Sequence, residues 1–348
     1  MIKILITDDS DTIAALLKTI FEKEPDMRVI GRARDGRQAV EMSRELRPDV
    51  ITMDIRMPIM DGFEATRSIM SSSPVPIVVI SSSVNDELQI CFRAIEEGAL
   101  AVIEKPHFVD LKGLQAISRK LVEAVRAMAG VKVVRRYIRQ SVIPVEVQVS
   151  VSDVPFHAFE IVAIGCSTGG PQALQAILSG LPAGFPTPIA VVQHMSQGFL
   201  LGMVEWLQKI TPLKLKLAED GEILQTSTVY FAPEDRHLIL KRTAGGLAVR
   251  LAGDPPVGQF RPSATTLFQS AACVCGKNAI GLLLSGMGDD GATGLLEMRK
   301  AGAHTVIQNM ESSIVFGMPG AALALNAVDK VVELNGIAPY LKGFVHGK

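Results

Sequence analysis

The chain has 348 residues, a length that favours about two domains, each large enough to bury a hydrophobic core. Its formal net charge of −1 argues against electrostatic binding to nucleic acid or to an anionic membrane surface. No apolar run reaches the ~20 residues that cross a bilayer, so we expect no membrane insertion. The first ten residues do not resemble a secretory leader, and the four cysteines lack the spacing of a zinc site or a disulfide framework. We therefore expect a reducing, cytoplasmic location.

Over residues 1–127, strand-like apolar runs alternate with amphipathic, helix-like stretches. Strands are predicted at 2–7, 28–33, 49–55, 76–82 and 101–106. Helices are predicted at 11–24, 37–46, 87–98 and 111–128. This alternation is typical of an α/β domain with a doubly wound parallel sheet.

The alternation stops after residue 127 and resumes near residue 158. The intervening segment, 128–157, contains a basic cluster, a proline and a mixture of polar and apolar residues, which indicates a linker. Predicted strands then return at 159–165, 188–194, 227–233, 278–286 and 304–309. We therefore expect a second α/β domain with a doubly wound parallel sheet over 158–348, with motifs different from those of the first.

Polar side chains gather at the carboxyl ends of the strands predicted in the first half. Asp8 and Asp9 follow the first strand, and Asp54 lies near the end of the third. Such ends converge on one edge of a parallel sheet, and clustered carboxylates there suit Mg²⁺. Ser81 and Lys105 end the fourth and fifth strands, where a hydroxyl and an ammonium can bind phosphoryl oxygens. Each residue alone is an ordinary strand-end residue, but the five together favour a site for phosphoryl chemistry.

The motifs "DDS", "MDIRMPIMDG", "ISSS" and "EKP", in this order, resemble a response-regulator receiver domain, which covers about residues 1–125 and has a flavodoxin-like fold. The resemblance implies that Asp54 accepts a phosphoryl group from the histidine kinase of a chemotaxis pathway. The implied Mg²⁺ ligands are Asp8, Asp9, Asp54 and the backbone carbonyl of Arg56, and the groups that read the phosphoryl group are Ser81 and Lys105. Val102 departs from the pattern, because many receivers carry an aromatic switch residue there.

A serine lies between glycines in "IVAIGCSTGGPQAL", residues 161–174. Ser167 follows a predicted strand and precedes a predicted helix, which is the G-x-S-x-G pattern of a nucleophile elbow. The same residue types also occur in ordinary tight turns, so the pattern alone leaves both readings open. If Ser167 is a nucleophile, the amide of Thr168 is a candidate oxyanion donor, and the loop around Met287 is a candidate for a second one.

A serine nucleophile needs a general base and a carboxylate that orients it. His194 is the best placed of six histidines, since it ends the predicted strand that follows Ser167. His237 and His304 precede strands instead of ending them. The remaining histidines lie beside the Lys-Pro pair of the first half, in the linker and in the tail: His107, His157 and His346.

The carboxylate is expected after the apolar run of "GLLLSGMGDDGATG", where Asp289 and Asp290 stand. An ionised Asp290 would accept the N–H of His194 and stabilise the imidazolium. Residues 286–291 also match the G-x-G-x-x-G dinucleotide pattern, with Glu311 at a suitable distance. Two carboxylates would repel a pyrophosphate there, so the triad interpretation is preferred.

The motifs "IGCSTGGP", "QHM", "AEDGE", "APEDRH", "RPSATTLF", "LSGMGDDGA" and "VFGMP" resemble the Rossmann-like catalytic domain of the chemotaxis methylesterase CheB family, over about 158–344. The resemblance implies hydrolysis of glutamate γ-methyl esters on chemoreceptor helices, with release of methanol, and deamidation of glutamines. It places the nucleophile on Ser167, the base on His194 and the orienting acid on Asp290, with no cofactor for the esterase reaction.

The family resemblance also implies regulation, because an unphosphorylated receiver covers the active-site cleft and phosphorylation loosens that packing. In "PPVGQFRPSAT", Gly258, Phe260 and Thr265 stand where relatives commonly carry polar or charged residues, so receptor recognition is expected to differ.

Two alternatives remain open from the sequence. In the first, the chain is a receiver-controlled binding module, and Ser167→Ala keeps the biological output. In the second, the chain is a related hydrolase that acts outside chemotaxis. A DNA-binding response regulator is disfavoured, because no basic recognition helix is present.

Overall fold

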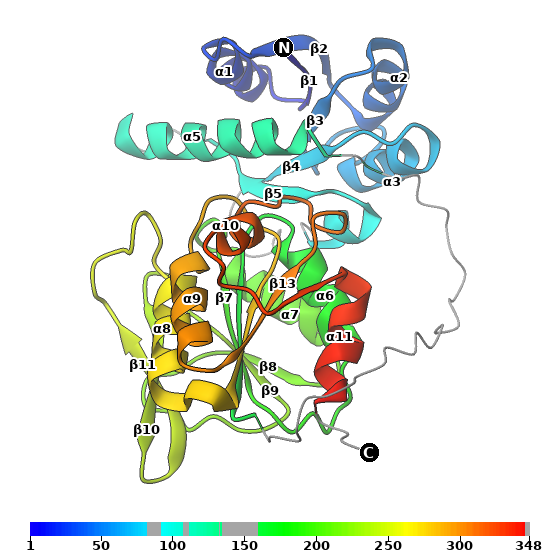
Figure 1. Ribbon diagram of the computed structural model, residues 1–348. Helices are drawn as coiled ribbons and strands as arrows, with labels where there is room; N and C mark the ends of the chain where they lie inside the picture. Colours follow the sequence, from blue (N-terminus) through cyan, green and yellow to red (C-terminus); the bar gives the residue numbers. More distant parts are fainter. Residues whose placement is uncertain (82–91, 107–110, 132, 134–158, 345–348) are drawn as a thin grey trace. The chain divides into compact units, whose positions relative to one another are not determined.

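The computed structural model describes residues 1–81, 92–106, 111–131, 133 and 159–344 (Figure 1). The chain divides into two compact units, Met1–Pro144 and Val145–Lys348. Most of the expected linker 128–157 lies outside the described residues, as do His107, His157 and His346. Within the described ranges, no helix is both long enough and apolar enough to cross a membrane.

The first unit contains a sheet of five parallel strands in the order β2-β1-β3-β4-β5. This is the flavodoxin-like order of a doubly wound sheet, as predicted. The strands are β1 (Ile2–Thr7), β2 (Met27–Ala33), β3 (Val50–Met53), β4 (Ile77–Ser81) and β5 (Ala101–Glu104). The helices are α1 (Asp11–Glu22), α2 (Gly36–Leu46), α3 (Gly62–Ser72) and α5 (Leu111–Met128).

Burial explains why these strands form the centre of the unit. Every residue of β3 and β4 is buried, as expected for parallel strands with helices on both faces. Helices α1 and α5 contact each other, and so do α2 and α3. The side chains of Ser10, Asp35 and Asp61 cap the N-termini of α1, α2 and α3. Of the helix expected at 87–98, residues 92–97 are helical and 87–91 lie outside the described residues.

The second unit contains a sheet of seven parallel strands in the order β14-β13-β12-β6-β7-β9-β8. Its strands are β6 (Ile161–Cys166), β7 (Ile189–Gln193), β8 (Lys214–Leu217), β9 (Thr228–Phe231), β12 (Ala279–Leu283), β13 (His304–Gln308) and β14 (Lys330–Val332). Its helices are α6 (Gly170–Ser179), α7 (Leu200–Gln208), α8 (Ala264–Cys275), α9 (Ala292–Lys300), α10 (Met318–Ala324) and α11 (Leu334–Gly343), and a short 3-10 helix, η1, covers Gly276–Asn278.

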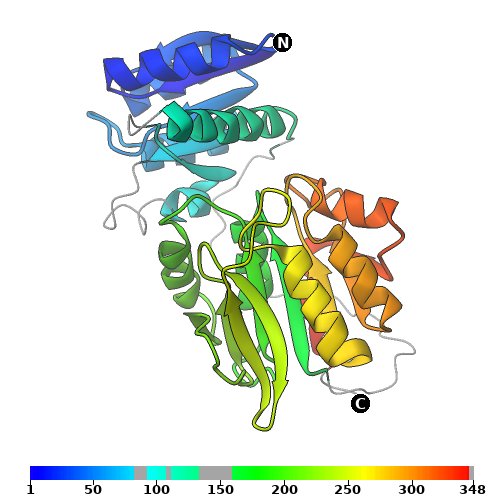
Figure 2. The ribbon, with the colours of Figure 1, turned by 90° about the vertical axis from the view of Figure 1, so that its left-hand side faces the viewer.

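Helices cover both faces of this sheet, as Figure 2 shows from the side. Helix α8 contacts β6, β7, β12 and α9, whereas α6 contacts α7 and α11. The predicted doubly wound parallel architecture is therefore confirmed. The edge strands β8 and β14 were not predicted. In addition, β10 (His237–Thr243) and β11 (Gly246–Ala252) form a separate antiparallel pair, which packs against α8.

Strand β6 occupies the topological switch point of the second sheet. It pairs with β7 on one side and with β12, which comes more than 110 residues later in the chain, on the other. In open α/β sheets, ligands bind beyond the carboxyl ends of the strands at such a point. The loops after β6, β7 and β12 are the three that carry the predicted catalytic residues.

Candidate active site

Ser167 lies one residue beyond β6, in a sharp turn that leads into α6. The Ser167 N–H donates to the Ser285 carbonyl (3.0 Å), and the Gly170 N–H donates to the Ser167 carbonyl (2.8 Å). Gly169 has a φ of 83°, and a Cβ at this residue would lie 2.6 Å from the Ser285 hydroxyl oxygen. Both the backbone conformation and the space therefore require glycine here. The strand–turn–helix context of a nucleophile elbow is present around Ser167.

Gln193, the buried last residue of β7, joins the backbones of Ser167 and His194. Its Nε2 donates to the Ser167 carbonyl (2.8 Å) and to the His194 carbonyl (2.7 Å). Its Oε1 accepts from the Cys166 thiol (3.1 Å), and burial raises the pKa of Cys166, so that this thiol stays protonated. The His194 N–H donates to the Cys166 carbonyl (2.9 Å). The buried side-chain amide of Gln193 thus fixes the backbone of Ser167 relative to that of His194.

The imidazole of His194 faces the carboxylate of Asp290. Its Nε2 lies 2.9 Å from Asp290 Oδ2, and the two side chains are only 10% and 3% exposed. The contact is bent, and neither ring nitrogen makes a well-aligned hydrogen bond to any described residue. Because Nε2 faces the carboxylate, Nδ1 is the ring nitrogen that points away from Asp290. No hydrogen bond joins Nδ1 to the Ser167 hydroxyl in this structure, as is common in unliganded sites.

Asp290 is held by the N-terminus of α8. Its Oδ1 accepts from the Ser263 hydroxyl (2.8 Å) and the Thr265 N–H (3.1 Å), and its Oδ2 accepts from the Ala264 N–H (2.7 Å). Burial alone would raise the pKa of Asp290, but the His194 imidazole and these donors outweigh it and lower the pKa to about 2. Asp290 is therefore an ionised carboxylate at neutral pH, as an orienting acid must be.

The loop after β12 passes directly beside Ser167. A Cβ at Gly286 would lie 2.9 Å from the Ser167 Cβ, so only glycine allows this approach. The Ser285 hydroxyl donates to the Thr168 carbonyl (2.7 Å), which ties the two loops together. The predicted oxyanion donors, the N–H groups of Thr168 and Met287, follow Ser167 and Gly286 in these two loops. Their donation to a substrate oxygen stays a prediction.

The two other described histidines contact residues other than Asp290. His237, the first residue of β10, is buried: its Nδ1 accepts from the Ser263 N–H (3.2 Å), and its Nε2 contacts the Pro255 carbonyl (3.2 Å). His304, the first residue of β13, contacts the Tyr340 hydroxyl (2.5 Å). His237 therefore acts within the fold, where it fixes the segment that leads into α8.

The three departures in the segment 255–265 have different positions. Gly258 lies in an exposed turn, and Phe260 stacks on the His194 ring. Thr265 is buried, and its hydroxyl accepts from the Gly291 N–H (2.8 Å) at the start of α9. The expectation of altered receptor contact therefore does not apply to Thr265, because its side chain supports a helix N-terminus inside the domain.

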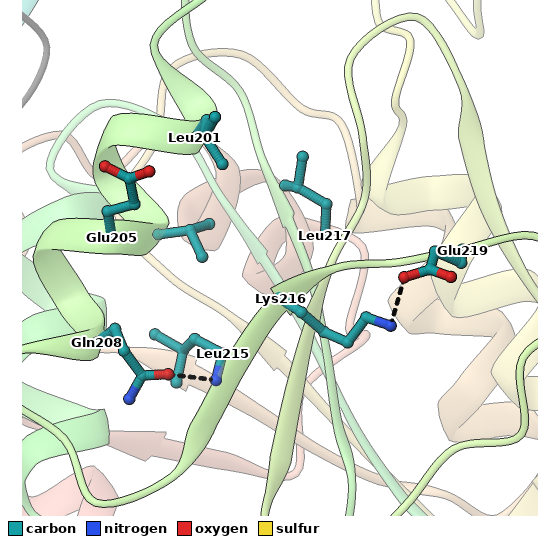
Figure 3. A pocket seen from close by; sticks show the side chains of 8 residues that line it. Leu201, Glu205, Gln208, Leu215, Lys216, Leu217 and Glu219 are labelled. Atoms are coloured by element: carbon teal, nitrogen blue, oxygen red, sulfur yellow. Dashed lines mark hydrogen bonds and ion pairs between the residues drawn. The ribbon is translucent and has the colours of Figure 1, made fainter. Parts of the chain in front are cut away.

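A surface hollow in the second unit lies elsewhere, between α7 and β8. Figure 3 shows the side chains that line it, among them Leu201, Glu205 and Leu217, with Lys216 paired to Glu219. None of the three predicted catalytic residues borders this hollow. It is therefore not part of the site around Ser167.

The first unit brings its predicted acidic residues together. Ligand oxygens of Asp8, Asp9 and Asp54 all lie within 4.8 Å of one another, with Asp8 and Asp54 buried and Asp9 exposed. Lys105 Nζ lies 2.7 Å from Asp54 Oδ2 and 3.1 Å from Asp8 Oδ2. Ser81 is buried, and its carbonyl accepts from the Lys105 N–H (2.7 Å), so β4 and β5 deliver the two residues side by side.

Burial and charge act in opposite directions in this acidic cluster. Burial raises the pKa of Asp54 above its usual value, although the Lys105 ammonium beside it acts to lower it. Burial lowers the pKa of Lys105, but Asp54 and Asp8 outweigh this and raise it, so the ammonium stays charged. Of the remaining predicted positions, Arg56 lies two residues after Asp54 and is exposed, and Val102 is half-buried against the hydrophobic core.

Sequence reasoning missed two residues that shape the second site, Gln193 and Ser263. Gln193 directly precedes His194 at the end of an apolar strand, so a buried amide at this place is a usable signal. Ser263 precedes the helix-like run "ATTLF", which is a readable N-cap signal. The sequence does not show that this cap also holds Asp290, because 26 residues separate Ala264 from Asp290.

Both halves of the chain match models of known protein families. The family model for CheB methylesterase matches residues 162–341, and the model for the response regulator receiver domain matches residues 4–117. A protein-glutamate methylesterase/protein-glutamine glutaminase from Methanospirillum hungatei is 44% identical over 94% of this chain and 93% of its own length. One from Myxococcus xanthus is 43% identical over 99% and 98%.

Solved structures agree with these sequence matches. The crystal structure of the Thermotoga maritima CheB methylesterase catalytic domain is 36% identical and aligns with a TM-score of 0.52, over 53% of this chain and 98% of that domain. A receiver domain and a methylesterase domain therefore follow each other in one polypeptide, and the chain belongs to the CheB methylesterase family.

Proposed function

We propose that the chain is a phosphorylation-activated serine hydrolase that removes the methyl group from glutamate γ-methyl esters of chemoreceptor helices. The contact of His194 with an ionised Asp290, in loops that flank Ser167 at the switch point of the sheet, carries this proposal. Membership of a family whose curated relatives bear the name protein-glutamate methylesterase/protein-glutamine glutaminase supports it.

In the proposed reaction, His194 Nδ1 takes the proton of the Ser167 hydroxyl as Oγ attacks the ester carbonyl carbon. The N–H groups of Thr168 and Met287 stabilise the negative charge on the carbonyl oxygen. The imidazolium then returns its proton to the leaving methoxide, which departs as methanol and leaves an acyl-enzyme on Ser167. Water hydrolyses the acyl-enzyme by the same proton transfers and releases the glutamate carboxylate.

Asp290 has a defined task in this scheme. It keeps its negative charge next to Nε2, so that the positive charge on the imidazole is stabilised when Nδ1 is protonated. Glutamine deamidation follows the same path with ammonia as the leaving group. No cofactor is needed for either reaction.

We propose further that Asp54 accepts a phosphoryl group from a histidine kinase, and that this modification raises the esterase rate. The donor set fits Mg²⁺: the oxygens of Asp8, Asp9 and Asp54 lie within 4.8 Å of one another, and this hard cation prefers carboxylate oxygens. Asp8 Oδ2 lies 3.1 Å from Lys105 Nζ but makes no well-aligned hydrogen bond to a described residue. Bound Mg²⁺ would neutralise charge on the phosphoryl oxygens, with the Arg56 carbonyl as a further ligand. Ser81 and Lys105 would bind the phosphoryl group once it is attached.

We also propose a cytoplasmic location, with chemoreceptor helices and a chemotaxis kinase as partners. The free thiols of Cys166, Cys273 and Cys275 support a reducing compartment. We propose as domain boundaries a receiver at 1–127, a linker at 128–157 and a methylesterase domain at 158–348.

The test is methanol release from methylated receptor membranes. We expect release by the wild-type protein and a loss of about 10⁶-fold for Ser167→Ala, as for removal of a nucleophilic serine in other hydrolases. Ser179→Ala, at the far end of α6, is the matched control and keeps the rate. A binding module would keep its output in the Ser167→Ala protein, and a hydrolase with another substrate would react with an active-site fluorophosphonate but leave the receptor esters intact.

A further inference from the structure

The ring of Phe260 lies flat on the imidazole of His194. The ring centroids are 4.2 Å apart, and the planes differ by only 10°. The Cζ edge of the Phe260 ring also reaches the loop that carries Asp290, because a Cβ on Gly288 would lie 3.9 Å from Phe260 Cζ. The aromatic ring therefore covers one face of the His194 imidazole.

The backbone around Phe260 is fixed. Val257 and Phe260 exchange two N–H to carbonyl hydrogen bonds of 3.1 Å, which close a four-residue turn. The segment is anchored before the turn by the Pro255 carbonyl on His237 Nε2, and after it by the Ser263 N–H on His237 Nδ1. Phe260 is thus presented by a short, doubly anchored segment and not by a free loop.

The His194 ring has few other restraints. Neither of its nitrogens makes a well-aligned hydrogen bond to a described residue, and its contact with Asp290 constrains only the Nε2 edge. A flat stacking partner restricts rotation of the imidazole plane, which decides whether Nδ1 points toward Ser167. The face of a phenyl ring also attracts positive charge, which appears on the imidazole during the reaction.

We propose that Phe260 is a positioning residue for His194: it holds the imidazole plane in the orientation that proton transfer with Ser167 needs, and it stabilises the imidazolium. The proposal rests on the proposed esterase function. Phe260 then acts inside the site, whereas the sequence alone led us to expect an effect of this position on receptor recognition.

The test compares Phe260→Leu and Phe260→Tyr by kcat and KM for methanol release. Leucine keeps apolar bulk but has no ring face, so we expect kcat to fall about 10-fold, with KM unchanged. Tyrosine keeps the face and restores kcat to about the wild-type value. Phe159→Leu is the control, because Phe159 is also half-buried and packs edge-on against Phe344, 5.1 Å away, without touching the triad.

Three results would overturn the proposal: an unchanged kcat for Phe260→Leu, a change confined to KM, or a Phe260→Tyr protein as slow as the leucine one. A KM effect alone would make Phe260 a substrate contact. The second readout is independent of activity. The ring protons of His194, assigned with His194→Gln, should lie upfield in the wild type and in F260Y and move downfield in F260L.

The two readouts separate the proposals. If the wild-type protein releases no methanol but the His194 signals move as described, then the proposed function fails while the stacking restraint stands. If methanol release is normal and the signals do not respond to F260L, the Phe260 proposal alone is refuted.

Discussion

The two domains each bury an aspartate at the carboxyl end of a parallel sheet, yet the two carboxylates differ in their surroundings. Counted over the whole residue, Asp54 and Asp290 are both 5% exposed. Asp54 pairs with the ammonium of Lys105, and its Oδ1 accepts a hydrogen bond from the Ile55 N–H (2.7 Å). Burial raises the pKa of Asp54. Asp290 receives three hydrogen bonds from the start of α8 and faces His194, and its pKa falls to about 2.

The difference shows that burial alone does not decide the state of a carboxylate. A helix N-terminus supplies several N–H donors that point at one place, and these stabilise the charged form. Asp54 instead lies among the carboxylates of Asp8 and Asp9 with one ammonium, that of Lys105, and there the effect of burial prevails. One environment stabilises the charged carboxylate, and the other makes the charged form less favourable.

The largest effect is expected from Asp290→Asn. Asparagine replaces one of the two acceptor oxygens by an NH₂ donor, so the donors that meet that oxygen lose their acceptor and the imidazolium loses its counter-charge. We expect kcat for methanol release to fall about 10⁴-fold, as when a triad aspartate becomes asparagine in other serine hydrolases. Asp289→Asn, the exposed neighbour, is the control. A fall below 10-fold would mean that Asp290 is not the orienting acid.

The second effect tests the other carboxylate. Asp54→Asn cannot accept a phosphoryl group, so the ratio of methanol release with and without a small phosphodonor should fall to about one. The basal rate should remain, because Asp54 lies in the receiver and not among the residues around Ser167. Glu41→Gln, an exposed acidic change in the same domain, should keep the wild-type ratio. Activation that persists in Asp54→Asn would place the phosphoacceptor elsewhere.

The third effect is on stability in acid. The pKa of Asp290 is about 2 in the folded protein and 3.8 ordinarily. Its charge therefore stabilises the fold above about pH 4, and this contribution, roughly 2 kcal/mol, is lost as the pH falls toward 2. Urea unfolding between pH 5 and pH 3, compared with that of Asp290→Asn, measures it. Equal pH slopes for the two proteins would contradict the depressed pKa.

The smallest effect is expected from Thr265→Val. Valine has a similar shape but no hydroxyl, so the buried Gly291 N–H at the start of α9 loses its acceptor. We expect the free energy of unfolding to fall by about 1–2 kcal/mol, with little change in kcat. Thr266→Val, at a half-buried neighbour, is the matched control in the same urea titration. A large loss of kcat without a loss of stability would instead point to a contact with substrate.

The sequence predicts the doubly wound fold and the neighbourhood of Ser167, His194 and Asp290 because strand ends in a parallel sheet converge. Periodicity locates the ends of β6, β7 and β12, and the parallel topology brings these ends to one edge of the sheet. The paired strands β10 and β11 were not expected as a separate sheet, since their apolar alternation does not reveal the direction of pairing.

The detailed contacts around the site could not be predicted. The stacking of Phe260 on His194 depends on how a segment 66 residues further along the chain folds back. Thr265 shows the reverse case, because the sequence suggested a residue that contacts the receptor. A threonine whose hydroxyl accepts from a helix N-terminus cannot be distinguished in the sequence from a threonine whose hydroxyl meets solvent. Only packing distinguishes these roles.

The position of the candidate catalytic strands within the seven-stranded sheet has a consequence for partial unfolding. Strands β12, β6 and β7 are interior, while β14 and β8 form the two rims. Fraying from either rim costs little free energy and leaves the interior ladder paired. Backbone amides of β14 and β8 should therefore exchange with deuterium long before those of β6. On warming, methanol release should continue at temperatures at which the outer strands have already begun to fray.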